Sequence, residues 1–294
     1  MKTVGFIGVG LMGSSMVRNL MKHGFSVRIY ARHPEKVSEV TAEGAVLCPS
    51  IAECVRGCDA VITMVGFPDD VRDVYYGEGR ILNSAAAGTY LIDMTTTSPA
   101  LSQDLSSAGA AKSLHVLDAP VTGGDAGARA GTLSILVGGE RADFEACLPL
   151  FQAMGTTINY QGGAGCGQHA KMANQIMIAG TLAGICEALA YARAKGLDLH
   201  VLLQSVATGA AGSRQLDLLG GKILNGDFAP GFYIKHFIKD MKLAAEEAGE
   251  SDLTLPVLRQ VLSEYCQLSE RGEDQLGTQA LIHYYEAADK TDAS

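Results

Sequence analysis

Residues 3–21 read Thr3-Val4-Gly5-Phe6-Ile7-Gly8-Val9-Gly10-Leu11-Met12-Gly13-Ser14-Ser15-Met16-Val17-Arg18-Asn19-Leu20-Met21, with Gly8, Gly10 and Gly13 in a G-x-G-x-x-G pattern. The apolar run before the glycines is typical of a buried strand, and the residues after them have the apolar spacing of a helix. In this context the first glycine allows a tight turn, the second lets a pyrophosphate approach the backbone, and the third lets the helix pack on the strand. The amides at the helix N-terminus then face the anion. The stretch predicts a dinucleotide-binding site.

Composition narrows the class of protein. The chain has 294 residues, which at about 150 residues per domain suggests two domains. Its net charge of -9 argues against a nucleic-acid partner, because phosphates select a basic surface. No secretory leader pattern precedes the first strand, and the longest apolar run, residues 176–186, is too short to cross a bilayer. We expect a cytoplasmic protein with no membrane partner.

Cysteine and histidine usage predicts no metal site. The seven cysteines form an odd set without a C-x-x-C pair, which favours small core residues in a reducing compartment; they are Cys48, Cys54, Cys58, Cys147, Cys166, Cys186 and Cys266. Cys54 and Cys58 lie one helical turn apart, but no second ligand pair follows them. The seven histidines are scattered, and no H-E-x-x-H motif occurs.

Strand-like and helix-like segments alternate as far as residue 160. Predicted strands after the first are residues 27–30, 60–64, 89–93, 116–119 and 133–137, and predicted helices between them include 34–43, 51–56 and 99–111. This alternation is typical of a doubly wound, mainly parallel sheet, the α/β Rossmann class. We assign residues 1–162 to an NAD(P)-binding domain of this class.

The pattern changes after the glycine-rich segment 162–167. One long helix is predicted over residues 168–195, and residues 176–185 are apolar on nearly all sides, so we expect this helix to be buried. Further helices are predicted over residues 201–207, 216–224, 234–248 and 256–271. Residues 163–294 are assigned to an all-α substrate and dimerisation domain, with a charged tail after Glu286 that is expected to fray. Burial of the long helix between subunits would give a homodimer or homotetramer.

A second motif, Asp-Ala-Pro-Val-Thr-Gly-Gly at residues 118–124, follows a predicted strand. Ligands of an open parallel sheet collect beyond the carboxyl ends of its strands, so this loop should face the same crevice as the nicotinamide. The Thr122 hydroxyl and the amides of Gly123 and Gly124 can hold a carboxylate. An ordinary surface turn explains these residues equally well.

Lys171 lies one turn into the long predicted helix, with Asn174 and Gln175 on nearly the same face. Oxidation of an alcohol by hydride transfer needs a group that takes the hydroxyl proton, and a lysine can do so when its pKa is lowered. The helix N-terminus and an oxidised nicotinamide would both lower it. Taken alone, a lysine early in a helix is more often solvated than catalytic.

Together these segments resemble the β-hydroxyacid dehydrogenase family, which contains 3-hydroxyisobutyrate dehydrogenase and tartronate semialdehyde reductase, with 6-phosphogluconate dehydrogenase as a larger relative. The resemblance covers nearly the whole chain and rests on residues 5–13, 118–124, 165–174 and 226–240 in family order. It implies interconversion of a short β-hydroxyacid, such as 3-hydroxyisobutyrate, and its semialdehyde with NAD(P). It also implies that Lys171 is the general acid/base.

The resemblance implies roles for the other matching residues. The substrate would be bound by Thr122, Gly123, Gly124, Asn174 and Gln175. Lys239 would reach the cofactor or substrate with Asp240 supporting it, although without the family a solvated charged pair is the simpler explanation. The residues expected at the cofactor are Gly8, Gly10, Leu11, Met12, Gly13, Arg32, Met64, Val65, Gly66, Thr96 and Lys239.

The chain departs from the family pattern at two positions. Gln175 stands where a second asparagine is usual, and Thr122 stands where serine is usual. The longer amide and the extra methyl group leave the chemistry intact and change the pocket that selects the substrate. Several substrates therefore remain possible. They are 3-hydroxyisobutyrate and the substrates of related enzymes, namely glyoxylate, succinic semialdehyde, tartronate semialdehyde and L-serine.

The end of the second predicted strand bears on the cofactor. An acidic residue there would hold the ribose hydroxyls of NAD, but residues 29–33 read Ile-Tyr-Ala-Arg-His. Arg32 can pair with a 2′-phosphate, helped by His33 or Lys36, so NADP is expected to be preferred over NAD. The alternative is that Arg32 stacks on the adenine and permits both cofactors.

Two other functions are compatible with a dinucleotide-binding fold. Imine reductases share the expected fold but generally lack the lysine, so Lys171 disfavours that activity. A catalytically inactive dinucleotide-sensing or scaffold protein is an alternative of another class. The presence of Lys171, Asn174, Thr122 and Lys239 disfavours it.

Overall fold

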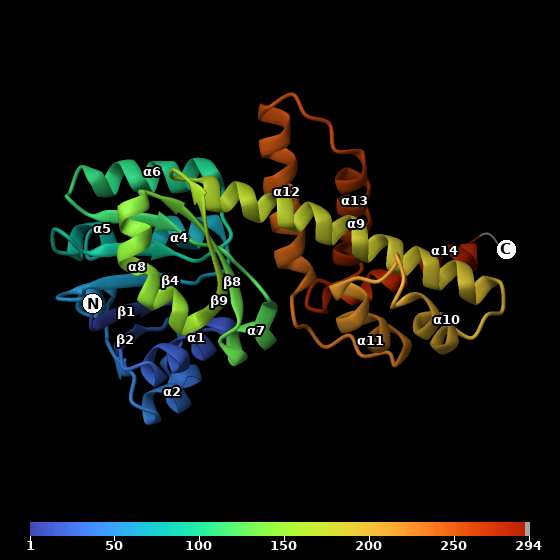
Figure 1. Cartoon of the computed structure of the whole chain (residues 1–294), viewed down its shortest axis with the longest axis horizontal. Coiled ribbons are helices and arrows are strands. Elements are labelled where there is room, and N and C mark those ends of the chain that lie inside the picture. Colours follow the sequence, from blue (N-terminus) through green and yellow to red (C-terminus); the bar gives the residue numbers. More distant parts are fainter. Residues whose placement is uncertain (292–294) are drawn as a thin grey trace. The chain divides into compact units, whose positions relative to one another are not determined.

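A computed structural model describes residues 1–291, with side chains described through residue 286. The chain divides into two compact units, residues 1–171 (unit 1) and the residues from Met172 onward (unit 2) (Figure 1). The division falls inside one continuous helix, α9 (Cys166–Ala194). The charged tail that was expected to fray lies outside the residues whose side chains are described.

Unit 1 is built on a nine-stranded sheet in the order β3-β2-β1-β4-β5-β6-β8-β7, with β9 paired to β8. The strands are β1 (Thr3–Ile7), β2 (Ser26–Tyr30), β3 (Val46–Leu47), β4 (Ala60–Thr63), β5 (Tyr90–Asp93), β6 (His115–Asp118), β7 (Val121–Thr122), β8 (Leu133–Gly139) and β9 (Gly155–Gly162). Strands β1 to β6 are parallel, and β8 runs antiparallel to β6. This mainly parallel order confirms the expected Rossmann class.

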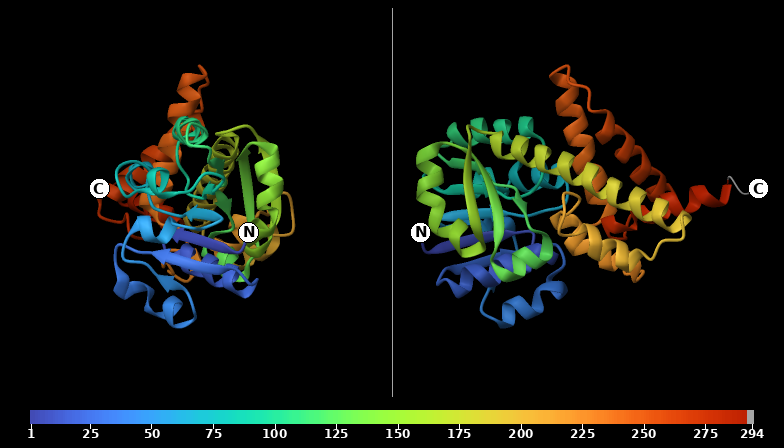
Figure 2. Two further views of the ribbon diagram at one scale, coloured as in Figure 1. Left: turned by 90° about the vertical axis from the view of Figure 1, so that its left-hand side faces the viewer. Right: turned by 45° about the vertical axis from the view of Figure 1, so that its right-hand side comes forward.

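Helices cover both faces of this sheet, because neighbouring strand residues point to opposite sides. Phe6 packs into a core with α1 and α8, whereas Ile7 packs into a second core with α3, α4, α5 and α6. Figure 2 shows the ribbons of unit 1 with helices on both sides of the sheet. The helices of unit 1 before α9 are α1 (Leu11–Lys22), the 3-10 turn η1 (Pro34–Val37), α2 (Ser38–Ala42), α3 (Ile51–Val55), α4 (Pro68–Tyr75), α5 (Ile81–Ser84), α6 (Pro99–Ala110), α7 (Gly124–Ala130) and α8 (Arg141–Met154).

Unit 2 is helical, which confirms the expected all-α character of this part of the chain. Apart from one isolated bridge between Tyr233 and Gly277, no strand pairing occurs in residues 172–291. After α9 come α10 (Leu199–Val206), the π-helical turn η2 (Leu216–Gly220), α11 (Gly221–Leu224), α12 (Ile234–Glu250), α13 (Pro256–Glu270), the 3-10 turn η3 (Thr278–Leu281) and α14 (Ile282–Thr291). The core joins Leu182 and Leu189 of α9 to Phe237 of α12 and Tyr265 of α13.

Helix α9 is long and apolar enough to cross a membrane by length and composition alone. One side of it packs into the core of unit 2, as expected of the central helix of a globular unit. Its other side carries Met177 and Tyr191, which are 66% and 65% exposed. The expectation of a buried helix is therefore met on one side only in the single chain.

Candidate functional site

The glycine loop after β1 has the form expected of a pyrophosphate cradle. Gly8 has φ +99°, and a Cβ added there would overlap the carbonyl oxygen of Met64. A Cβ on Gly13 would overlap the carbonyl oxygen of Gly8, so both positions require glycine for the fold itself. Gly10, the N-cap of α1, has no atom within 4 Å of an added Cβ. The backbone is thus open at the residue where the sequence places the pyrophosphate.

Two further loops lie beside the glycine loop at the carboxyl ends of neighbouring strands. Met64 donates its backbone N–H to the carbonyl oxygen of Ile7 at 2.9 Å. Val65 donates its N–H to the Thr95 hydroxyl at 3.0 Å. Residues 64–66 and 95–97 therefore share the sheet edge with residues 8–13, which brings most of the predicted cofactor residues of unit 1 together.

Arg32 lies just beyond the end of β2 and forms an ion pair. Its Nη1 atom is 3.1 Å from Oδ1 of Asp70 in the first turn of α4, and the Arg32 side chain is 72% exposed. The other carboxylate oxygen of Asp70 accepts the backbone N–H of Phe67 at 3.1 Å. Because β1 lies between β2 and β4, the Arg32–Asp70 pair links segments on either side of the strand that carries the glycine loop.

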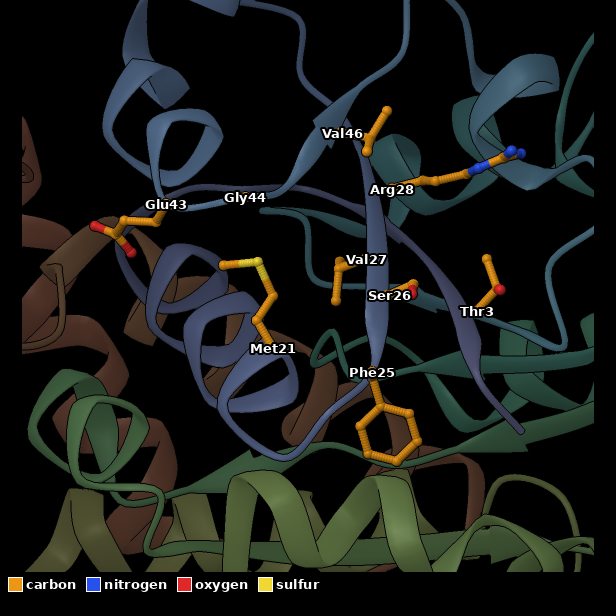
Figure 3. A pocket seen from close by; sticks show the side chains of 9 residues that line it. All are labelled: Thr3, Met21, Phe25, Ser26, Val27, Arg28, Glu43, Gly44 and Val46. Carbon is orange, nitrogen blue, oxygen red and sulfur yellow. The ribbon is translucent and has the colours of Figure 1, made fainter.

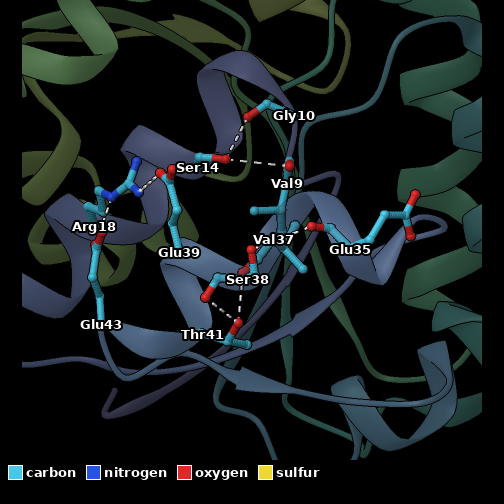
Figure 4. Close-up of polar contacts among 10 residues, drawn as sticks. All are labelled: Val9, Gly10, Ser14, Arg18, Glu35, Val37, Ser38, Glu39, Thr41 and Glu43. Carbon is cyan, nitrogen blue, oxygen red and sulfur yellow. Dashed lines mark hydrogen bonds and ion pairs between the residues drawn. The ribbon is translucent and has the colours of Figure 1, made fainter.

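The segment after Arg32 is tied to the glycine-loop helix (Figure 4). The Arg18 guanidinium on α1 contacts Glu39 at 3.2 Å and Glu43 at 2.7 Å. The hydrogen bond from Arg18 lowers the pKa of the Glu43 carboxyl. On the first turn of α1, the Ser14 hydroxyl donates to the carbonyl oxygen of Gly10 at 2.9 Å. These contacts fix α2 against α1 and keep the cradle backbone in place.

The carboxylate loop and the first turn of α9 are joined by buried hydrogen bonds within unit 1. The Asp118 carboxylate accepts the N–H groups of Gly165 and Gln168 at 2.8 and 2.9 Å. The Gln168 amide accepts the N–H of Thr97 at 3.0 Å and donates to the carbonyl oxygen of Thr95 at 2.8 Å. Burial raises the pKa of Asp118 to about 6, against the opposing effect of its two hydrogen bonds. Lys171 is itself buried and follows Gln168 by three residues on α9, so this network sets its position relative to residues 95–97.

The predicted carboxylate-binding residues bridge β7 and α7. Thr122 is half-buried and pairs with Ser134 of β8. Gly123 and Gly124 have φ of +130° and +61°, a backbone conformation that favours glycine. An ordinary turn would use the same conformations, so the carboxylate role stays a prediction.

The predicted site residues of unit 2 form one hydrogen-bonded chain. Asn174 Nδ2 donates to Gln175 Oε1 at 2.7 Å, and Gln175 Nε2 donates to Asp240 Oδ2 at 2.6 Å. Lys239 Nζ lies 2.8 Å from the other Asp240 oxygen. Gln175 and Asp240 are each 1% exposed. The solvated charged pair considered for Lys239 and Asp240 is therefore wrong, because the carboxylate is buried.

Three residues of these networks had no role assigned from sequence. Asp118 and Gln168 lie inside two of the four motifs that carry the family resemblance, and that position is the signal that could have found them. Asp70 lies in a segment with no motif. A polar residue shortly after a predicted strand was its only signal.

A cavity of about 470 Å³ lies elsewhere in unit 1 (Figure 3). Its lining includes Thr3 and Ser26, the first residues of β1 and β2, together with Met21, Phe25 and Gly44. It is therefore at the amino ends of these strands, opposite the edge where the glycine loop lies. It takes no part in the site described above.

Family models match both parts of the chain. Residues 3–163 match the NAD binding domain of 6-phosphogluconate dehydrogenase, and residues 165–285 match the NAD-binding domain of NADP-dependent 3-hydroxyisobutyrate dehydrogenase.

Similar proteins match over nearly their full length. An uncharacterized oxidoreductase, YkwC, from Bacillus subtilis is 48% identical over 95% of this chain and 97% of its own. A probable 3-hydroxyisobutyrate dehydrogenase-like protein from Arabidopsis thaliana is 42% identical (95% and 84%), and the 2-hydroxy-3-oxopropionate reductase of Escherichia coli is 34% identical (96% and 97%). A solved structure of Mycobacterium tuberculosis 3-hydroxyisobutyrate dehydrogenase with L-serine is 31% identical, with a TM-score of 0.87 over 96% of this chain and 98% of that one.

Proposed function

The chain belongs to the 3-hydroxyisobutyrate dehydrogenase family of NAD(P)-dependent hydroxyacid dehydrogenases, and we propose that it interconverts a short β-hydroxyacid and its semialdehyde, with NADP preferred. The observation that carries this proposal is the anchoring of Lys171. It is buried, and Asp118 and Gln168 pin the helix turn before it to the sheet edge that carries the glycine loop. A solvated surface lysine would not need such a scaffold.

In the proposed mechanism the residues of this chain move one proton and orient the substrate. In the oxidation direction the neutral Lys171 amine takes the proton of the substrate hydroxyl. In the reduction direction its ammonium form protonates the nascent alkoxide. The nicotinamide, when bound, accepts the carbinol hydrogen as hydride or returns it. Thr122, Gly123 and Gly124 hold the substrate carboxylate, which decides the carbon that faces the ring.

The cofactor proposal rests on Arg32. The guanidinium is largely exposed at the end of β2, where a 2′-phosphate could reach it. No carboxylate occurs at residues 29–33 to hold the ribose hydroxyls of NAD. His33, which could assist Arg32, lies 3.3 Å from Glu35 and is likewise exposed.

The substrate is proposed to be 3-hydroxyisobutyrate or a close analogue. Relatives at 34% identity or above include a 2-hydroxy-3-oxopropionate reductase. The mycobacterial structure is described as that of the enzyme with L-serine. A panel of 3-hydroxyisobutyrate, L-serine, glycerate, tartronate semialdehyde, glyoxylate and succinic semialdehyde, each with NADP and NAD, separates these alternatives by kcat/KM. Absence of turnover with every compound of the panel and either cofactor would overturn the substrate class.

The catalytic assignment is tested with Lys171→Ala. We expect turnover to fall by about 100-fold to 10,000-fold, because a general acid/base contributes on this scale, with NADPH binding by fluorescence titration retained. Lys112→Ala, which removes an exposed lysine of unit 1 outside the described site, is the control and should keep full activity. Near-normal turnover of the Lys171 variant would refute the role. Turnover lost together with NADPH binding would point to a structural role instead.

We also propose a cytoplasmic homodimer or homotetramer in which the exposed side of α9 is covered. Met177 and Tyr191 on that side are large apolar groups in contact with solvent in the single chain. Light scattering at micromolar concentration should give a mass above that of one chain, and Met177→Glu should lower it. A monomeric wild-type protein would refute this proposal.

A further inference from the structure

We propose that Asp70 is a specificity-determining residue that restrains the preference for NADP by holding the Arg32 guanidinium and adding negative charge beside it. This inference rests on the proposed role of Arg32 as the 2′-phosphate ligand. It adds an opposing group from another segment, the first turn of α4, that the sequence motifs did not identify.

The geometry places Asp70 where the adenosine ribose is expected. In a Rossmann sheet the ribose lies near the end of the second strand, where an acidic residue selects NAD. This chain has no acid at the end of β2, but Asp70 reaches Arg32 from beyond β4 at 3.1 Å. The carboxylate of an NAD-type site is thus supplied from a different element. It stands beside the very guanidinium that would bind the phosphate.

The Asp70 side chain is held firmly, whereas the Arg32 side chain is not. Asp70 is 18% exposed, and one of its oxygens caps α4 through the N–H of Phe67. Arg32 is 72% exposed, and Asp70 is the acid that it contacts within 4 Å in the described structure. The Asp70 carboxylate offsets part of the positive charge that the exposed Arg32 guanidinium would offer to a phosphate, and it repels the phosphate directly. A ribose 2′-hydroxyl meets no such repulsion.

The substitution Asp70→Asn separates this effect from folding. Asparagine keeps the oxygen that accepts the Phe67 N–H and has the same shape, so the cap on α4 is retained. Asp69→Asn makes the same charge change in the same helix turn. Asp69 is exposed and has no contact with Arg32, which makes it the matched control.

The experiment measures binding of adenosine 2′,5′-bisphosphate and 5′-AMP by calorimetry, alongside kcat/KM with NADP and NAD. Asp70→Asn should tighten the bisphosphate about threefold to fivefold, the range of a partly exposed charge pair, and leave 5′-AMP within about twofold. The ratio of NADP to NAD use should rise by the same factor. Asp69→Asn should change neither quantity beyond about 1.5-fold.

The double variant Arg32→Ala/Asp70→Asn completes the cycle. Because Asp70 acts mainly through Arg32, the gain from Asp70→Asn should shrink to less than about twofold in the Arg32→Ala background, where only its direct repulsion of the phosphate is left. An equal gain with and without Arg32, an equal gain from Asp69→Asn, or weaker bisphosphate binding in Asp70→Asn would each overturn the inference. Arg32→Ala alone tests the NADP proposal separately, because unchanged bisphosphate affinity there would refute Arg32 as the phosphate ligand whatever Asp70 does.

Discussion

The Asp118 carboxylate accepts the backbone N–H of Gln168 at 2.9 Å, joining the end of β6 to the first turn of α9. Both residues are buried, at 3% and 0% exposure. The contact fixes the helix turn that leads to Lys171. An ionised carboxylate in this place is stabilised by two N–H donors and destabilised by loss of water, and the second effect is the larger.

The stability contribution of Asp118 should therefore depend on pH. Its pKa is raised from 3.8 to about 6, so the contribution is fully present below pH 3.8 and is lost as pH rises through about 6. A pKa difference of this size corresponds to about 3 kcal/mol. Chemical unfolding of the wild type and Asp118→Asn at pH 4, 5, 6, 7 and 8 gives the difference between their unfolding free energies at each pH.

That difference should move in favour of the asparagine variant by up to about 3 kcal/mol between pH 4 and pH 8, since asparagine stays neutral throughout. Subtracting the unfolding free energy of the variant from that of the wild type removes the contribution of the other titrating carboxylates. A flat difference over this range would mean that Asp118 has an ordinary pKa in the folded protein. A change in the opposite direction would mean that its hydrogen bonds outweigh the loss of water.

Gln168→Ala should destabilise the protein by about 2 to 4 kcal/mol, because it leaves the buried N–H of Thr97 and carbonyl of Thr95 without their partner. Turnover should also fall, since the turn that carries Lys171 loses one of its two anchors. Gln103→Ala removes an exposed glutamine from α6 and should change stability by less than about 0.5 kcal/mol. Urea unfolding and steady-state kinetics on both variants make the comparison. Equal stability of the two variants would show that the Gln168 bonds contribute nothing net.

An element of the fold could be predicted where its sequence pattern lies within one short stretch of the chain. The strand–glycine–helix start and the long apolar helix were found because their patterns lie within one stretch of sequence. Helix α8 contains Pro149, which weakens its sequence signal, and β9 was not predicted, since its side chains are mostly exposed or half-buried and lack a buried apolar face. Strand β3 has only two residues, both exposed. Such an element exists because its neighbour β2 pairs with it, which a local pattern cannot show.

The site residues also fall into those with a local sequence pattern and those joined only by tertiary packing. Lys171, Asn174 and Gln175 share one helix, so their spacing was visible in the sequence. The bond between Gln175 and Asp240 joins residues 65 positions apart, and the Arg32–Asp70 pair joins the loop after β2 to the first turn of α4. Partners of this kind follow from tertiary packing. The family resemblance named Asp240 but gave no reason to expect its burial.

Two glycines of the loop, Gly13 and Gly10, should separate effects on folding from effects on cofactor binding. Gly13→Ala should destabilise the protein by several kcal/mol, about the cost of forcing a backbone clash, because the added methyl overlaps the Gly8 carbonyl. Gly10→Ala meets no atom within 4 Å and should fold with an unchanged melting temperature. Its methyl would occupy the space proposed for the pyrophosphate, so NADPH should bind at least about tenfold more weakly. Differential scanning fluorimetry with and without NADPH reads both effects. Wild-type NADPH affinity in the Gly10→Ala protein would show that the pyrophosphate does not bind against this residue.

Gln175 departs from the family pattern, and its hydrogen bonds in the structure show what the longer side chain does. Both ends of its amide are occupied, the oxygen by Asn174 and the nitrogen by Asp240. The amide therefore ties Asn174 to Asp240, and one N–H and one lone pair of the amide are not used by these two bonds. In Gln175→Asn the side chain is one methylene shorter, so it cannot keep both contacts at the present backbone positions.

We expect Gln175→Asn to raise KM for the hydroxyacid several-fold, with a smaller change in kcat, because Asn174 and Lys239 lose their common support while Lys171 keeps its own anchors. The free energy of unfolding should fall by about 1 to 2 kcal/mol, the cost of a lost buried hydrogen bond. Gln204→Asn makes the same change at an exposed position of α10 and should alter neither quantity. If Gln175→Asn lowered kcat alone at constant KM, the amide would act on the transition state directly. That result would assign to the second N–H of the Gln175 amide a contact with the substrate that strengthens in the transition state.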